Sequence, residues 1–108
     1  MQIITRDQLQ QRLDRKSIRL VEVLESEHYD MFHLPGAINV PLDEDFEQEF
    51  EAAVPDKSEP VALYCMSRVC DAAPKAAHRL EEMGYTSVYG YEAGKMDWRG
   101  AGLPMETT

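Results

Sequence analysis

Short apolar runs alternate with longer amphipathic segments along the whole chain. The apolar runs have the composition of buried strands, and the clearest of them is Val61–Tyr64. Segments with apolar residues three to four positions apart predict helices between the strands. The expected strands are residues 3–4, 19–23, 38–40, 61–64 and 87–89. This alternation predicts an α/β fold with a mainly parallel central sheet of about five strands flanked by helices.

Capping and glycine signals indicate where several of the expected helices begin and end. Thr5 followed by Gln8 has the spacing of a capping box, which predicts that the first helix begins there. Ser26 is expected to cap a second, short helix. Gly84 suits the left-handed position just after a helix that runs from about residue 72 to residue 83.

Two further helices are expected from their apolar residues. The acidic segment 43–53 places Phe46 and Phe50 four residues apart on one face, and its carboxylates form a solvated face. The segment Gly94–Gly100 is a short helix in which Trp98 is expected to be a core residue.

Charge and size exclude several classes of function. The chain has 108 residues with a formal net charge of -9, which fits one domain over residues 1–108. Nucleic-acid binding needs clustered Lys and Arg, so neither nucleic acid nor an anionic membrane is an expected partner. We expect a cytoplasmic protein, because no leader pattern and no transmembrane run is visible. Its two cysteines are therefore expected to be reduced.

Cys65 is the strongest candidate for chemistry. It comes directly after the clearest strand, where parallel sheets bind ligands, and a loop and a helix follow it. Main-chain N–H groups of such a loop are expected to approach the sulfur, lower its pKa and hold an anion or a terminal persulfide sulfur. Arg68, the only cation in the loop, would add a charge-assisted contact. From residue type alone, Cys65 is equally well interpreted as a small buried hydrophobic residue.

Cys70 has three interpretations that the sequence leaves open. It resolves an oxidised Cys65 as a disulfide, accepts sulfur from Cys65, or only fills space in the loop, which we favour. Two cysteines with scattered histidines make a poor zinc site, so no metal or cofactor is expected. The histidines His28, His33 and His78 are each expected to be surface or capping residues.

Several strings resemble rhodanese-like domains, in the right order and over nearly the whole chain. The most specific combination is Leu-Pro-Gly-Ala-Ile-Asn-Val-Pro at residues 34–41 together with a strand that leads into Cys65. Further similar strings are residues 20–23, 80–85, 88–89 and 101–104, with Gly94 and Trp98 between them.

This resemblance implies a sulfurtransferase in which Cys65 is the nucleophile. The thiolate would take sulfane sulfur from thiosulfate or a persulfide and pass it to a thiol, cyanide or a protein acceptor. The substrate-binding loop that the family implies consists of Met66, Ser67, Arg68, Val69 and Cys70.

Several positions depart from the family pattern, among them Arg68, which stands where a Gly is common. Many relatives read Asp-Val-Arg in the front strand, whereas this chain has Glu22-Val23-Leu24 and so lacks the Arg of an ion pair. Many relatives also have a cation directly after the cysteine and an Arg five residues after it, where this chain has Met66 and Cys70. Fewer cations predict weaker binding of the thiosulfate dianion and favour a less charged or protein-bound donor.

Two other functions remain on the same fold. One is a non-catalytic or redox-sensing module in which Cys65 and Cys70 form a disulfide under oxidant. The other is a phosphatase or arsenate reductase, which is disfavoured because such enzymes need a longer loop that ends in an Arg. Here Cys70 stands five residues after Cys65, and no Arg follows in the loop.

Overall fold

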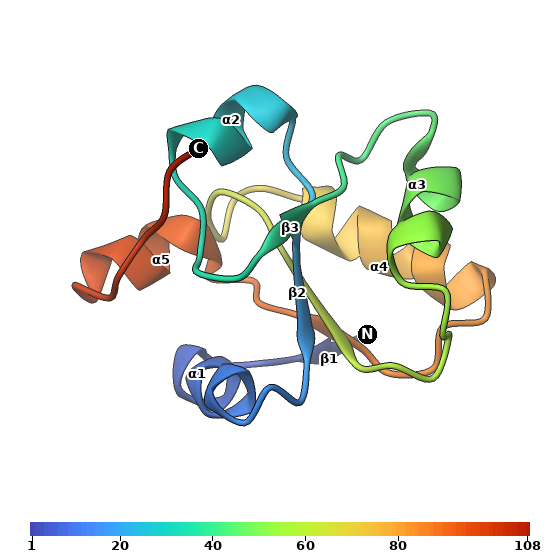
Figure 1. Ribbon diagram of the computed structural model, residues 1–108, viewed down its shortest axis with the longest axis horizontal. Coiled ribbons are helices and arrows are strands. Elements are labelled where there is room, and N and C mark those ends of the chain that lie inside the picture. The colour runs from blue at the N-terminus through green and yellow to red at the C-terminus, as the bar shows by residue number, and fades with distance from the viewer.

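The computed structural model describes residues 1–108 and has one central sheet of five strands, all paired in parallel (Figure 1). In space the strands follow the order β1-β5-β4-β2-β3. Their bounds are β1 (Gln2–Ile3), β2 (Arg19–Glu22), β3 (Ile38–Asn39), β4 (Val61–Tyr64) and β5 (Val88–Gly90). The predicted fold class is confirmed.

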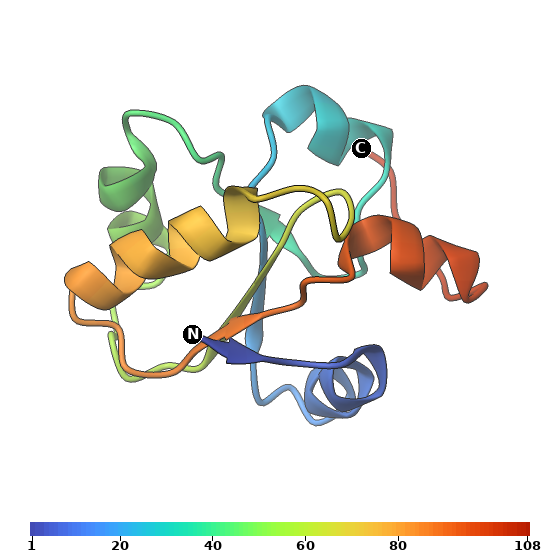
Figure 2. The same ribbon diagram turned by 180° about the vertical axis from the view of Figure 1, so that it is seen from behind.

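Helices cover both faces of this sheet. Figures 1 and 2 show α1 and α5 on one side of the sheet and α3 and α4 on the other. The short helix α2 follows the carboxyl end of β2 (Figure 1). The bounds are α1 (Arg6–Asp14), α2 (Ser26–Met31), α3 (Phe46–Ala53), α4 (Ala72–Glu82) and α5 (Gly94–Gly100). None of them combines the length and apolar composition that crossing a membrane requires.

The core has two halves because successive residues of a strand point to opposite faces. Val21 and Leu63 belong to the half under α3 and α4, whereas Leu20 and Ala62 belong to the half under α1 and α5. In the first half, the predicted pairing of two aromatic rings on one helix face is confirmed. These rings, Phe46 and Phe50, are fully buried, with centroids 5.6 Å apart. In the second half Trp98 is buried, as predicted.

The predicted start of α1 and the predicted end of α4 are confirmed. The Thr5 hydroxyl accepts a hydrogen bond from the Gln8 amide at 3.2 Å, and the Gln8 side chain accepts one from the Thr5 amide at 3.0 Å. This reciprocal pair is the predicted capping box. Gly84 has a φ of 100°, as expected just after α4.

Two other expected helix ends are wrong. Ser26 is the first residue of α2 and not its cap, because the preceding Glu25 takes the N-cap position without a side-chain hydrogen bond. The acidic helix begins at Phe46 and not at Asp43, since the Asp43 carboxylate accepts the Asp45 amide at 2.9 Å in a turn.

The prediction that His33 is a surface or capping residue is also wrong. His28 and His78 are exposed, but His33 is only 5% exposed. Its ring stacks on the Tyr29 ring with centroids 3.8 Å apart, and its Nδ1 lies 2.8 Å from the Tyr29 carbonyl oxygen. Its backbone forms a bridge with Glu106, so this histidine is a structural residue near the C-terminus.

Candidate active site

Cys65 directly follows β4 at the carboxyl edge of the sheet, and α4 begins at Ala72. The start of the intervening loop is held by the first turn of α5. The Lys95 amide donates to the Cys65 carbonyl at 3.0 Å, and the Met96 amide donates to the Met66 carbonyl at 3.0 Å. Two helices therefore determine where the loop begins and ends.

Gly94 allows α5 to approach this closely. It has a φ of 77°, which L side chains rarely adopt. A Cβ atom at Gly94 would lie 2.6 Å from the Ser67 nitrogen and 2.7 Å from the Met66 carbonyl carbon and oxygen. The contact between the loop and α5 therefore requires glycine.

The Cys65 thiol is nearly enclosed. It is 2% exposed, belongs to the core half under α3 and α4, and its Sγ donates to the Cys70 carbonyl at 3.4 Å. The main-chain amides of Ala73 and Met66 act on the sulfur and lower its pKa, but burial has the larger effect and raises the pKa to about 12. The prediction of a lowered Cys65 pKa is therefore wrong for this conformation, because burial destabilises the thiolate more than the two amides stabilise it.

Cys70 lies beside this sulfur. Its half-buried side chain packs against the core half that contains Cys65, and it also raises the Cys65 pKa. Its amide donates to the Ser67 carbonyl at 3.1 Å, which folds the loop back on itself. Both cysteines are free thiols.

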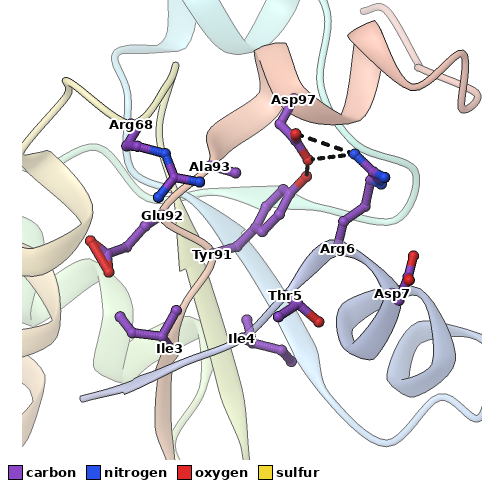
Figure 3. Close-up of a pocket in the computed structure, with 10 residues that line it drawn as sticks. All are labelled: Ile3, Ile4, Thr5, Arg6, Asp7, Arg68, Tyr91, Glu92, Ala93 and Asp97. Carbon is purple, nitrogen blue, oxygen red and sulfur yellow. Dashed lines mark hydrogen bonds and ion pairs between the residues drawn. The ribbon is translucent and has the colours of Figure 1, made fainter.

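The remaining loop residues differ in exposure. Met66 and Ser67 are half-buried, whereas Arg68 and Val69 are exposed, Val69 to 95%. The Arg68 side chain lines a hollow of about 390 Å³ to which Cys65 does not contribute (Figure 3). A role of Arg68 in sulfur binding stays a prediction.

The hollow beside Arg68 is organised by a polar network on the α1 and α5 side. The Tyr91 hydroxyl donates to Asp97 Oδ2 at 2.6 Å, and Arg6 Nη1 lies 3.2 Å from both carboxylate oxygens of Asp97 (Figure 3). Burial and the hydrogen bond to Asp97 raise the pKa of the Tyr91 hydroxyl, so it stays a donor.

A second hollow, of about 280 Å³, adjoins the carboxyl end of β2 and the start of α4. Three of its lining residues pack against the core half that contains Cys65: Leu24, Leu42 and Ala72. Its other lining residues are Val23, Glu25, His28, Pro41 and Asp43. The lining contains no Lys or Arg, so it offers a dianion no permanent positive charge.

The parallel sheet, with a cysteine at the carboxyl end of its central strand β4, fits the family that the sequence resembles. Residues 5–101 match the rhodanese-like domain family. The chain belongs to this family.

Proteins similar to this rhodanese-like domain include sulfurtransferases and a regulator. Thiosulfate sulfurtransferase PspE of Escherichia coli is 40% identical over 68 residues, which cover 63% of this chain and 62% of PspE. An HTH-type transcriptional regulator of Mycobacterium tuberculosis is 33% identical over 103 residues, covering 95% of this chain and 44% of the regulator. The chain thus spans less than two thirds of each of these relatives.

Among solved structures, the thiosulfate sulfurtransferase of Pseudomonas aeruginosa superposes with a TM-score of 0.87 at 30% identity. The match covers 99% of this chain and 20% of that one. The rhodanese-like fold therefore extends over nearly the whole chain.

One polar pair near the site of this rhodanese-like domain was missed by sequence reasoning. Lys95 and Glu22 are both fully buried, and Lys95 Nζ lies 3.0 Å from Glu22 Oε2. The ammonium also donates to the His28 carbonyl at 2.8 Å and to the Phe32 carbonyl at 2.7 Å. A Glu in a buried strand was a signal that a cation must lie nearby, but nothing local identified Lys95 as that cation.

The front strand therefore keeps an ion pair although Leu24 stands where many relatives have Arg. One group of carboxylates has the spacing of possible metal ligands, and its members, Asp43, Asp45 and Glu49, are all exposed. Such exposed acidic groups are common without a metal.

Proposed function

We propose that this rhodanese-like domain is a sulfurtransferase that carries sulfane sulfur as a persulfide on Cys65. The observation that supports this most is the placement of the Cys65 sulfur between β4 and α4, where the amides of Met66 and Ala73 act on it. Those two amides favour an ionised sulfur, as both transfer steps require. The sulfurtransferase names of similar proteins point the same way.

The first transfer step forms the persulfide. The Cys65 thiolate attacks the outer sulfur of thiosulfate, the sulfur–sulfur bond of the donor breaks, and sulfite leaves with the electron pair. With a persulfide donor, the leaving group is a thiolate. In the second step a thiol, cyanide or a protein acceptor attacks the terminal sulfur, and Cys65 leaves as the thiolate.

A donor reaches Cys65 only after the loop moves. Cys65 is 2% exposed as a residue, and its thiol remains protonated near neutral pH in this conformation. We infer that the exposed part of the loop, around Arg68 and Val69, opens while α5 continues to hold its start. The closed state then protects a persulfide from solvent.

The donor is inferred to carry less charge than thiosulfate. The hollow next to the start of α4, which Cys65 itself does not line, has no Lys or Arg in its lining, and the position after Cys65 is the uncharged Met66. A persulfide on a small thiol or on a protein fits this environment better than a dianion. We further propose that the protein is cytoplasmic, because free thiols such as Cys65 and Cys70 persist in that reducing compartment.

The proposed domain comprises residues 1–108. Segments close to both termini take part in it, since β1 pairs with β5 and Glu106 forms a backbone bridge with His33.

Intact-mass analysis tests the proposal. The Cys70→Ser variant is incubated with thiosulfate, or with a persulfide of a small thiol, and then desalted. We expect a gain of one sulfur atom that maps to Cys65 and that a thiol removes. The matched control, which carries Cys65→Ala as well, gains none. A folded Cys70→Ser protein that acquires no sulfur from either donor would contradict the proposal.

A further inference from the structure

The second cysteine of the loop contacts the first. The Cys65 Sγ atom is 3.4 Å from the carbonyl oxygen of Cys70, and that oxygen and the Cys70 side chain belong to the same residue. The Cys70 side chain itself raises the pKa of the Cys65 thiol, and it packs against the same half of the core. Both thiols are free, so each is available for reaction with the other.

We propose that Cys70 resolves the persulfide on Cys65, so that this domain has a second activity, the reduction of sulfane sulfur to hydrogen sulfide. The inference rests on the proposed function, because the Cys65 persulfide is its substrate.

The step balances without an external reagent. Cys70 loses its proton and attacks the Sγ atom of Cys65, and a sulfur–sulfur bond forms between the two residues. The bond between Cys65 Sγ and the terminal sulfur breaks, and the terminal sulfur leaves with the electron pair and takes up the proton as hydrogen sulfide. The Cys70 sulfur is oxidised and the terminal sulfur is reduced. A dithiol reductant then returns both cysteines to thiols.

Burial favours Cys70 over an external acceptor in this step. A persulfide on the nearly enclosed Cys65 is reached by a solvent thiol only when the loop opens, whereas Cys70 already lies beside it. Holding two reacting groups together replaces a bimolecular encounter with an intramolecular one. The turn between Ser67 and Cys70 folds the loop back so that Cys70 lies next to Cys65.

The experiment compares the wild-type protein with Cys70→Ser. Each is reduced, freed of reductant and given one equivalent of thiosulfate or of a small-molecule persulfide, without an added thiol. Sulfide is trapped with a bimane reagent, and the protein mass is recorded before and after reduction.

For the wild type we expect about one equivalent of sulfide per chain and a Cys65–Cys70 disulfide, seen as the loss of two hydrogen atoms. Cys70→Ser is expected to keep the added sulfur and release no sulfide. A wild-type protein that retains the adduct on Cys65, or carries it on Cys70, overturns the inference but leaves the proposed function standing.

A failure of the proposed function has a different signature, since Cys70→Ser then gains no sulfur at all. Cys70→Ala serves as a second variant, and the circular dichroism and unfolding midpoint of both variants establish that they are folded. If either folded variant releases sulfide as fast as the wild type, Cys70 is not the resolving thiol.

Discussion

Lys95 Nζ lies 3.0 Å from Glu22 Oε2, and neither side chain is exposed to solvent. This ion pair connects the carboxyl end of β2 with the first turn of α5. The backbone amide of the same lysine donates to the Cys65 carbonyl, while its ammonium donates to the carbonyls of His28 and Phe32. One residue therefore connects β2, α2 and the start of the loop that follows Cys65.

Replacing this lysine is expected to destabilise the domain strongly. In Lys95→Met the Glu22 carboxylate stays buried without its cation, and removing one partner of a buried pair typically costs about 3–5 kcal/mol. Urea unfolding measures the loss. The double variant Lys95→Met with Glu22→Leu is the control and is expected to recover part of it. A single variant as stable as the wild type would contradict the assigned role of the pair.

Gly94→Ala is expected to disturb the loop as well as the local backbone. The new Cβ would be 2.6 Å from the Ser67 nitrogen, so α5 and the loop must separate, which typically costs about 1–3 kcal/mol in addition to the strain of a positive φ. The matched control is Gly102→Ala, which has the same φ of 77° and no atom within 4 Å of its Cβ. We expect slower sulfur transfer only in Gly94→Ala, and equal rates in both variants would argue against this contact.

Alkylation of Cys65 should depend steeply on pH. In Cys70→Ser, where Cys65 is the only thiol, the rate with iodoacetamide is expected to be low at neutral pH and still rising beyond the ordinary thiol pKa. The reason is that burial, the largest cause of the raised Cys65 pKa, remains in this variant, whereas the value of about 12 belongs to the wild type. A fast reaction with a plateau below neutral pH would show instead that the closed conformation is not the main one in solution.

The raised pKa of Cys65 also makes the stability of the folded domain depend on pH. The folded state holds the Cys65 proton more tightly than the unfolded chain, because its pKa lies above the ordinary value of 9.0. This contribution is complete below pH 9 and is lost as the pH rises from 9 towards 12. Urea unfolding across this range, with Cys65→Ala as the control, should show a steeper loss of stability in the protein that keeps Cys65.

Met66→Arg is expected to shift donor preference towards thiosulfate. The substitution places a guanidinium directly after Cys65, at a position that is uncharged in this chain. We expect kcat/KM for thiosulfate to rise roughly tenfold, which corresponds to about 1.4 kcal/mol, with little change for a persulfide donor. The uncharged Met66→Gln is the control. A similar gain for both donors in Met66→Arg would exclude charge as the reason.

The sequence determined the elements of this domain and the place of its candidate nucleophile. Strand composition, the capping box at Thr5 and the glycine after α4 depend on neighbours a few residues away. Such local features can therefore be interpreted without a fold. The position of Cys65 between a strand and a helix is a local feature of this kind.

Only the tertiary structure decided how the site is enclosed and supported. The burial of Cys65, the side on which Arg68 lies, and the pairing of Lys95 with Glu22 depend on packed elements distant in sequence. The last pair is separated by 73 positions. Desolvation and ion pairing act through space and not along the chain, so residue spacing does not carry that information.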